Sequence, residues 1–559
     1  MYFTLAVSAA TTGTCAALTA ASRDADPRLM PLPGPARVAW RAPDGLAAVL
    51  HWGPASGGGA RSYADSIWAE AAVVHARTGL ARVDPVYLAE VAGAVVLSDR
   101  ASWAAAVTGH LHDADPVLAG AFLSLGYPVG GVTPFRGVRA LSGGRTVRAA
   151  RGRARVRADR EEASAGGGEH GPGPGQVASA LIEAVRPLSE AELSLTGGKD
   201  SRLIAAALVA AGVPFRARTH GFASHPDVIV AGMIAGRLGL EHAVTEPAAP
   251  GTPSPAEVLG RLRATVLVSD GMLSAFENVG RPDPPASGGS GPAQTGGHGG
   301  ELLRGGYAPP AWERRWSSAA GAELFRRMTT RRLGLLRPAA SRAYLAALAP
   351  SAAALARGPL PGLDNFYLVN RAGRWSAAAR QAYLLRSPLA QPFFADPVVR
   401  AARAVPLRDR LRDRLHRDVL VRLCPELLDI PLAGRPWQGE ASNPVTVLTG
   451  SGGGPDWRRD LGPALAGFLR GYVLDSDAMF TVVNRTAAER ALRLPLADPQ
   501  AAWALATLAA LMSGDWLNAR DTAAAGPGPA SPRVAGPGAI SPGRTGSLPA
   551  RSTAPPPRG

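Results

Sequence analysis

Hydrophobic and polar positions divide the chain into a strand-rich first part and a second part in which strands and helices alternate. In the first 150 residues, short apolar runs stand between turn residues, for example at 1–7, 38–40 and 92–97. Such runs predict β-strands, whereas the pattern at 117–125 predicts a helix. We therefore predict an α+β sandwich for residues 1–150.

The pattern changes after residue 176. It predicts, in order, a helix, a strand, a helix, a strand and a helix at 177–186, 192–196, 201–211, 215–219 and 227–238. This alternation is typical of a parallel sheet with helices on its faces. Because residues 311–522 have a mostly helical pattern, the predicted fold class is α/β with a helical C-terminal part.

Glycine and proline mark the predicted boundaries. We predict a linker at 151–176, with an edge strand at 151–155 as the alternative for its first residues, and a Gly/Pro-rich loop at 281–300. The Gly-Gly turn at 142–144 predicts a hairpin. We predict a second domain at 177–522 and a disordered tail at 523–559, which carries four arginines and no acids.

Charge and cysteine content limit the partners. The net charge of the 559-residue chain is +16, but only one of its 60 basic residues is a lysine, Lys199. The arginines are scattered along the sequence, which favours a compositional bias over a nucleic-acid partner. Cys15 and Cys424 have neither disulfide-framework nor zinc spacing and fit a reducing cytoplasm.

The sequence contains no apolar run of membrane-spanning length. Residues 1–21 lack a basic start and fit a strand better than a signal peptide. We therefore expect a cytoplasmic protein without a membrane or nucleic-acid partner; an RNA-modifying enzyme is the alternative that the positive charge leaves open.

The segment Thr196-Gly197-Gly198-Lys199-Asp200-Ser201 has the composition of a phosphate-binding turn. Glycines permit backbone angles closed to other residues, and a helix that starts after them directs unpaired N–H groups into the turn. Lys199 adds a positive charge, and Asp200 beside an anion indicates a divalent cation such as Mg²⁺. An ordinary capped strand-to-helix turn explains Asp200 or Ser201 alone, but not the whole set.

This segment resembles the PP-loop, Ser-Gly-Gly-x-Asp-Ser, of ATP pyrophosphatases, with Thr196 in place of the serine. Within that group it is most similar to the asparagine synthetase family, which includes β-lactam and lasso-peptide macrolactam synthetases. Segment 296–307 resembles the second motif of that family, with Glu301 at its metal-binding aspartate. Asp227, 238–242, 392–396 and 424–427 resemble further family segments.

The first domain resembles the glutaminase-type domain of the same enzymes, through Asp99-Arg100, 126–127, 133–138 and 141–143. Three departures stand out. Tyr2 occupies the position of the glutaminase cysteine, so the resemblance implies a degenerate domain without glutamine hydrolysis. Asp413, beside Arg412 and Arg414, occupies the position at which the family has a lysine late in the chain. Leu384 or a neighbour occupies the position of the glutamate that the family has before segment 392–396.

The resemblance implies an ATP-dependent amide ligase of the asparagine synthase type. It would adenylate a small-molecule or peptide carboxylate, release pyrophosphate and transfer the acyl group to an amine or ammonia, with ATP and Mg²⁺ required. Alternatives are an intramolecular lactam or macrolactam synthetase and a catalytically reduced ATP-binding regulatory protein. A homodimer is also compatible with the resemblance.

The implied site residues fall into three groups. The catalytic candidates are Lys199, Asp200, Arg414 and His416. The ATP- and pyrophosphate-binding candidates are Leu195, Thr196, Gly197, Gly198, Asp200, Ser201, Thr219, Gly296 and Gly297. The metal ligands would be Asp200 and Glu301. His298 lies in the second motif and is either a phosphate contact or a surface residue, and a packing role is expected for Trp437.

Overall fold

A computed structural model describes the following parts of the chain: 3–23, 37–52, 67–70, 73–158, 173–246, 253–277, 292–308, 318–384, 388–434, 436–438, 447–448, 458–459 and 461–518. The structure is mixed α/β with several sheets, and the four-stranded sheet of the second part is parallel. Predictions that concern Tyr2, most of the linker at 151–176 and the tail at 523–559 lie outside the described residues.

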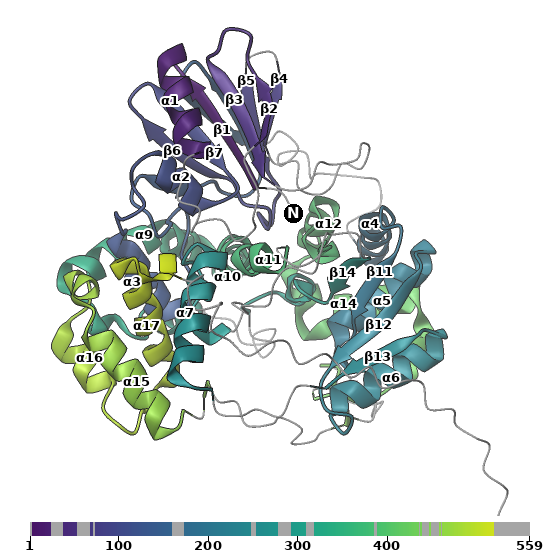
Figure 1. The fold of residues 1–559 in the computed structure, drawn as a ribbon. Coiled ribbons are helices and arrows are strands. Elements are labelled where there is room, and N and C mark those ends of the chain that lie inside the picture. The colour runs from purple at the N-terminus through teal and green to yellow at the C-terminus, as the bar shows by residue number, and fades with distance from the viewer. Residues whose placement is uncertain are drawn as a thin grey trace, which may run out of the picture.

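The first part is a two-sheet sandwich (Figure 1). The six-stranded sheet has the order β2-β3-β1-β7-β6-β8, with the strands Arg37–Arg41, Ala47–Trp52, Phe3–Ala9, Ala94–Ser98, Tyr87–Val91 and Val138–Ala140. The four-stranded sheet has the order β10-β9-β5-β4, with the strands Arg153–Ala158, Arg145–Ala150, Val73–Thr78 and Ile67–Glu70. All these pairings are antiparallel, and one cluster that includes Val49, Leu88, Leu97 and Val147 fills the space between the sheets. The predicted sandwich is thus present.

Two details of this part differ from the sequence prediction. The turn at 142–144 is not a hairpin, because β8 pairs with β6 in one sheet and β9 pairs with β5 and β10 in the other. Gly143 passes so close to Leu80 that a Cβ would lie 2.2 Å from its carbonyl oxygen. The run at 92–97 begins as a strand only at Ala94, because Gly93 turns the chain with a φ of +71°.

The second part contains the parallel sheet, in the order β13-β12-β11-β14. Its strands are His242–Thr245, Phe215–His220, Ala191–Ser194 and Ala293–Gly296. The helices α4 (Pro174–Val185), α5 (Lys199–Ala211), α12 (Asp396–Ala404) and α14 (Arg414–Leu423) pack together, while α6 (Pro226–Leu238) packs on β12 and β13. Apolar residues of these elements form one cluster around Leu193, Ile204 and Val230.

The predicted boundaries here need three corrections. The helix expected at 177 begins at Pro174, since proline is well suited to a first helical turn. The helix expected at 201 begins at Lys199. The loop expected at 281–300 includes strand β14, whose residue Gln294 donates a hydrogen bond of 2.8 Å to Glu192 on the neighbouring strand.

Helices form most of the remaining described chain, as expected. They are α7 (Pro255–Ser269), α8 (Ser318–Thr329), α9 (Pro338–Arg357), α10 (Pro359–Phe366), a π-helix η7 (Tyr367–Ser376), α11 (Ala377–Leu384), α13 (Leu407–Arg410), α15 (Pro463–Leu474), α16 (Arg485–Ala491) and α17 (Pro499–Ser513). Short strands β15 (Leu432–Ala433) and β16 (Val447–Leu448) pair in parallel. Among the described helices, none is both long and apolar enough to cross a membrane.

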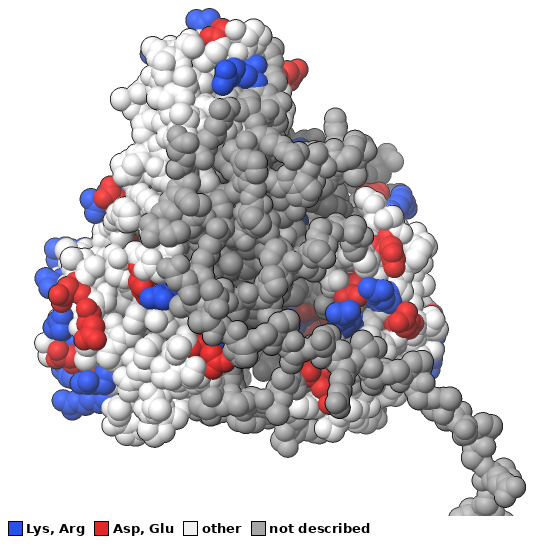
Figure 2. Space-filling model, in the orientation of Figure 1, with Lys and Arg blue, Asp and Glu red and all other residues white. Residues whose placement is uncertain are grey.

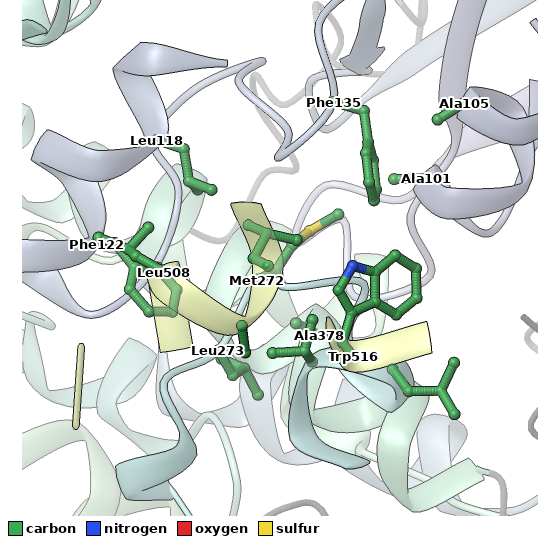
Figure 3. Packing of buried hydrophobic residues seen from close by; sticks show 14 of the residues in the cluster. Ala101, Ala105, Leu118, Phe122, Phe135, Met272, Leu273, Ala378, Leu508 and Trp516 are labelled. Carbon is green, nitrogen blue, oxygen red and sulfur yellow. The ribbon is translucent and has the colours of Figure 1, made fainter. Parts of the chain in front are cut away.

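One hydrophobic cluster joins the sandwich to the helical part. Phe135 and Phe122 of the first 150 residues lie in the same cluster as Met272, Leu508 and Trp516 (Figure 3). The rings of Phe135 and Trp516 are 6.5 Å apart between centroids, and both side chains are almost fully buried. The sandwich therefore shares a packed interior with helices that are hundreds of residues away in the sequence.

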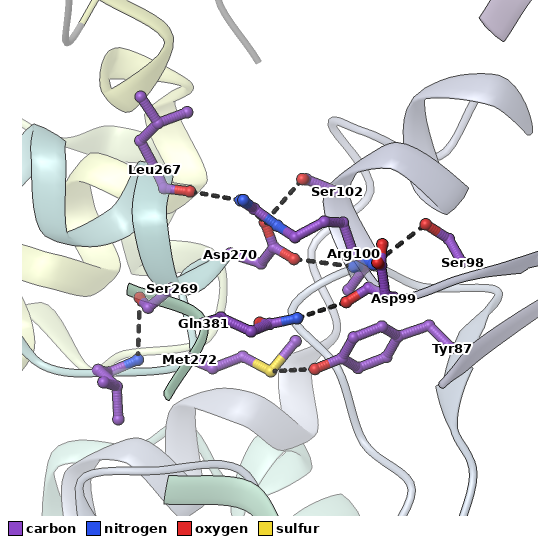
Figure 4. Close-up of polar contacts among 12 residues, drawn as sticks. Tyr87, Ser98, Asp99, Arg100, Ser102, Leu267, Ser269, Asp270, Met272 and Gln381 are labelled. Atoms are coloured by element: carbon purple, nitrogen blue, oxygen red, sulfur yellow. Dashed lines mark hydrogen bonds and ion pairs between the residues drawn. The ribbon is translucent and has the colours of Figure 1, made fainter. Parts of the chain in front are cut away.

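A buried ion pair crosses the same boundary (Figure 4). Arg100, at the start of α2 (Ala101–Val107), pairs with Asp270, which follows α7. The Asp270 carboxylate also accepts hydrogen bonds from the Ala101 N–H at 2.8 Å and from the Ser102 hydroxyl at 2.7 Å. These contacts fix the sandwich against α7.

Candidate functional site

The candidate phosphate loop lies where the strand order of the parallel sheet reverses. Strand β11 leads into the loop 195–198 and then into α5; β12 and β13 follow on one side of β11, while β14 lies on its other side. Because all four strands are parallel, the segments after β11 and β14 meet at the same edge. In open α/β sheets, ligands bind outside the carboxyl ends of the strands at such a point.

The two motifs that resemble family segments are in direct contact here. A Cβ added to Gly297 would lie 2.7 Å from the Ser201 nitrogen and 2.8 Å from the Asp200 Cβ. A Cβ added to Gly300 would lie 2.4 Å from the Asp200 Cγ. The segment 296–301 thus lies against the first turn of α5, and it can do so only because glycines line the contact.

The glycines of the loop itself serve close packing, and the prediction of special backbone angles was wrong. Neither Gly197 nor Gly198 has a positive φ; Gly198 has a φ of −76°. A Cβ at Gly197 would instead lie 2.5 Å from the Ala433 Cβ and 2.8 Å from the Val230 Cβ. The absence of a side chain lets β15 and α6 approach the loop.

Several donors predicted to face an anion are engaged within the loop. The Gly197 N–H donates to Asp227 Oδ1 at 3.0 Å, and the Gly198 N–H donates to the Thr196 hydroxyl at 3.3 Å. The hydroxyl oxygens of Thr196 and Ser201 are 3.0 Å apart. The loop is therefore held in shape by its own hydroxyl groups and by Asp227 of α6, with Thr196 exposed and Ser201 buried.

Lys199 is held by residues that sequence reasoning did not assign to it. Its ammonium forms an ion pair with Asp413, donates to the Pro436 carbonyl at 2.8 Å and lies 5.2 Å from the centre of the Trp437 ring. Burial lowers the pKa of Lys199, and the Asp413 carboxylate opposes that shift. Trp437 therefore covers the lysine as well as packing. Asp413 has a left-handed backbone, with a φ of +61°.

Asp200 lies between two basic side chains. Arg304 donates to its Oδ2 at 2.6 Å, and His416 Nε2 approaches its Oδ1 to 2.8 Å. Burial raises the pKa of Asp200, but contacts with His416, Arg304 and Lys199 outweigh it and hold that pKa below its ordinary value. The structure thus brings the predicted residue His416 into the site, whereas the Arg414 side chain is exposed at the start of α14.

Several polar atoms around this pair of charges are buried without a hydrogen-bond partner. Among the described residues, Asp200 Oδ1, Arg304 Nε, both His416 ring nitrogens and Trp437 Nε1 are buried without a hydrogen-bond partner. The His416–Asp200 contact has the distance of an ion pair but not the alignment of a hydrogen bond. Because leaving buried polar groups unpaired is costly, these atoms are candidates for contacts with a ligand.

Glu301 follows this contact region and accepts a hydrogen bond of 3.0 Å from the Tyr367 hydroxyl. Burial, together with the Glu301 carboxylate, raises the pKa of Tyr367 well above its ordinary value. Tyr367 lies beside Tyr307, with ring centroids 5.4 Å apart. The sequence indicated Glu301 but not the tyrosine partner, which comes from η7.

The remaining predicted residues have structural contacts. The Thr219 hydroxyl donates to the Leu195 carbonyl at 2.8 Å and lies 2.8 Å from His242 Nε2, so it links two strands below the loop. The Leu195 side chain is fully buried, and its backbone N–H donates to the Arg218 carbonyl at 2.9 Å, so this residue serves the sheet. His298 is exposed, with its ring 6.3 Å from that of Tyr383.

A magnesium ion at this site would need coordinating atoms from a bound ligand in addition to those of the protein. No group of three or more histidine, cysteine, aspartate or glutamate side chains in the described part of the chain is arranged to hold a metal. Asp200 and Glu301 supply two carboxylates in adjoining segments. Mg²⁺ commonly uses one or two carboxylates and completes its shell with phosphate oxygens and water, so these residues fit the ion in the presence of a polyphosphate.

Comparison with known proteins adds no relative. No protein-family model matches the chain, and no curated protein matches it.

Proposed function

We propose that the chain binds ATP with its phosphates at Thr196–Ser201 and uses it to activate a carboxylate for amide formation. The observation that carries this proposal is the charged cluster at the reversal point of the parallel sheet, in which Lys199 and His416 are buried and Asp200 and Arg304 are half-buried. Its cations provide the charge that a polyphosphate requires. We also propose that the sandwich is a glutaminase-type domain and that the second part is a PP-loop synthetase domain.

The reaction would proceed in two steps. The substrate carboxylate attacks the α-phosphorus of ATP, and the bond to the bridging oxygen breaks, so that an acyl-adenylate and pyrophosphate form. An amine or ammonia then attacks the acyl carbon, AMP leaves, and the amine loses a proton. Lys199 and Arg304, both in contact with this site, would stabilise the negative charge of the departing pyrophosphate, in the manner of a preorganised electrostatic site. Magnesium, held by Asp200 and Glu301, would neutralise phosphate charge.

Tyr367 and Glu301 support amide formation in particular. The Glu301 carboxylate, which accepts a hydrogen bond from the Tyr367 hydroxyl, can accept the proton that the attacking amine releases once magnesium has left with the pyrophosphate. An intramolecular amine, as in a lactam or macrolactam synthetase, fits this arrangement as well as free ammonia does.

The test is release of pyrophosphate from ATP in the presence of Mg²⁺ and panels of carboxylates and amines. Lys199→Ala and Asp200→Asn should reduce turnover by about 100-fold or more, because each removes a charge from the phosphate site. Arg326→Ala is the matched control: it removes an exposed arginine that pairs with Glu323, and activity should not change. Equal turnover in Lys199→Ala and wild type would refute the site assignment.

A second candidate function is an ATP-binding protein with reduced catalysis. It is favoured by the pairing of Lys199 with Asp413, because that carboxylate neutralises the charge that the loop would otherwise present. Calorimetric ATP binding without pyrophosphate release by any substrate pair would select this candidate. Asp413→Asn should then strengthen ATP binding.

A further inference from the structure

The outer face of the four-stranded sheet carries an unusual set of side chains. On its inner side, Ile67, Val74, Ala76 and Val147 are buried in the sandwich. Because side chains alternate along a strand, the intervening positions of β4, β5, β9 and β10 point outward. The outward positions at 68, 70, 77, 148, 153, 155 and 157 are all exposed.

Five of these outward side chains are arginines. They are Arg77, Arg148, Arg153, Arg155 and Arg157. In the described strands of this sheet the outward positions include one acid, Glu70. Arg148 lies directly opposite Arg155, and like charges in that arrangement destabilise a sheet. Within the described strands, the positions paired with these two arginines hold no acid that would offset the repulsion.

An aromatic pair extends the line of cross-strand neighbours that contains Arg148 and Arg155. Trp68, His75, Arg148 and Arg155 are consecutive cross-strand neighbours. The Trp68 and His75 rings stack, with centroids 5.4 Å apart and planes at 11°. Trp68 is nevertheless 38% exposed, so one face of a large ring remains accessible to solvent.

This face differs in charge from the helical and parallel-sheet parts that Figure 2 shows, where acidic and basic side chains are interspersed. A single edge strand needs only a few charges to prevent pairing with another chain. Here Arg77 and Arg148 lie on interior strands of the sheet, so edge protection does not explain them. The expectation that arginines are scattered fails on this face.

We propose that this arginine face, with the Trp68–His75 stack, binds single-stranded nucleic acid. The arginines would contact phosphates, and a base would stack on the accessible Trp68 ring, the combination used by proteins that bind single strands. Alternate residues along β10 are about 6.6 Å apart, so Arg153, Arg155 and Arg157 form a line that an extended backbone can follow. The proposal is independent of ATP chemistry at the parallel sheet.

The experiment measures binding of the full chain to a fluorescent single-stranded oligonucleotide of about 12 uridines by anisotropy, over a series of salt concentrations. For four or five phosphate contacts, the logarithm of affinity should fall with the logarithm of salt with a slope of about −3. Arg148→Gln combined with Arg155→Gln should weaken binding about tenfold and make the slope shallower by about 1.4. Trp68→Ala should weaken binding about tenfold, with an unchanged slope.

The matched control is Arg342→Gln combined with Arg357→Gln, which removes the same charge from exposed positions of α9. It should bind like wild type, apart from a small change at low salt. Equal loss in both double variants would overturn the proposal, because binding would then follow net charge alone. Failure of the wild type to bind the oligonucleotide would also overturn the proposal. So would the following combination: Trp68→Ala binds the oligonucleotide as tightly as wild type does, and the wild type binds anionic phosphatidylserine vesicles with the same affinity as the oligonucleotide.

Discussion

The buried pair of Arg100 and Asp270 provides the sharpest test of how the sandwich is joined to the helices. In Asp270→Asn the shape of the side chain is kept, and asparagine tolerates the left-handed backbone of this position, whose φ is +51°. The substitution removes the negative charge and replaces one carboxylate oxygen by an N–H donor. It therefore changes the electrostatics of the contact with little change in volume.

The expected loss follows from the contacts of the carboxylate. Oδ1 accepts from Arg100 and from the Ser102 hydroxyl, and Oδ2 accepts from the Ala101 N–H. The introduced asparagine would direct its amide N–H groups toward one of these donors, and the fully buried guanidinium of Arg100 would lose the carboxylate with which it pairs. Removing one partner of a buried pair costs about 3–5 kcal/mol, so we expect a decrease of that size in the free energy of unfolding.

Urea unfolding, followed by tryptophan fluorescence and by far-UV circular dichroism, measures this loss. Asp477→Asn is the matched control, because Asp477 pairs with Arg485 at 2.7 Å while 93% exposed; it should change the free energy of unfolding by about 0.5 kcal/mol or less. Adding Arg100→Met to Asp270→Asn should cost less than the sum of the two single changes. A wild-type midpoint for Asp270→Asn would refute the reasoning.

Three further predictions concern the loop contacts, the thiols and acid stability. Gly297→Ala should abolish ATP binding in calorimetry, because its Cβ would lie 2.7 Å from a nitrogen of the first turn of α5, whereas Gly236→Ala, with open space around it, should bind normally. Cys15 and Cys424 are buried, and burial raises the pKa of each thiol, that of Cys424 to about 12. Neither thiol should therefore react with a thiol reagent at a pH of about 8 until urea unfolds the chain. Rapid reaction of both thiols in the native state would contradict this prediction. Because the pKa of Asp200 is lowered in the folded chain, its charge stabilises the fold fully above the ordinary aspartate pKa of about 4, and less as the pH falls through the lower pKa of the folded state. The difference in the free energy of unfolding between wild type and Asp200→Asn should therefore shrink below a pH of about 4. A difference that grows at low pH would contradict the direction of the pKa shift.

Local pattern was sufficient for most elements that surround the candidate site. The apolar strands at Ala191–Ser194 and Phe215–His220 are each followed by a helix with a clear apolar stripe, so their parallel pairing could be predicted. Strand β14 could not, because Ala-Gln-Thr-Gly has no apolar run. Its Gln294 is accommodated by a hydrogen bond to Glu192, a partner that only the folded sheet supplies.

The part of the site formed by consecutive residues could be predicted from the sequence, whereas the contacts between residues far apart in the sequence could not. Lys199, Asp200 and Ser201 adjoin one another in the sequence, and a phosphate loop could be proposed from them alone. The pairing of Lys199 with Asp413 joins residues 214 positions apart, and the contact of Asp200 with Arg304 joins residues 104 positions apart. No periodicity encodes such pairings, because they depend on how α5, η4 (Gly300–Arg304) and α14 meet.

The shared interior of the sandwich and the helices also sets limits on how this chain can evolve. Phe135 and Phe122 are packed among residues such as Leu508 and Trp516, so they remain under selection for packing whether or not the sandwich retains any chemistry of its own. Shortening the chain to residues 177–522 would expose the sandwich-facing side of Trp516 to water. We expect natural relatives to vary freely at the exposed sandwich strands while conserving the volume of these buried residues, and to retain the sandwich even when it no longer catalyses a reaction.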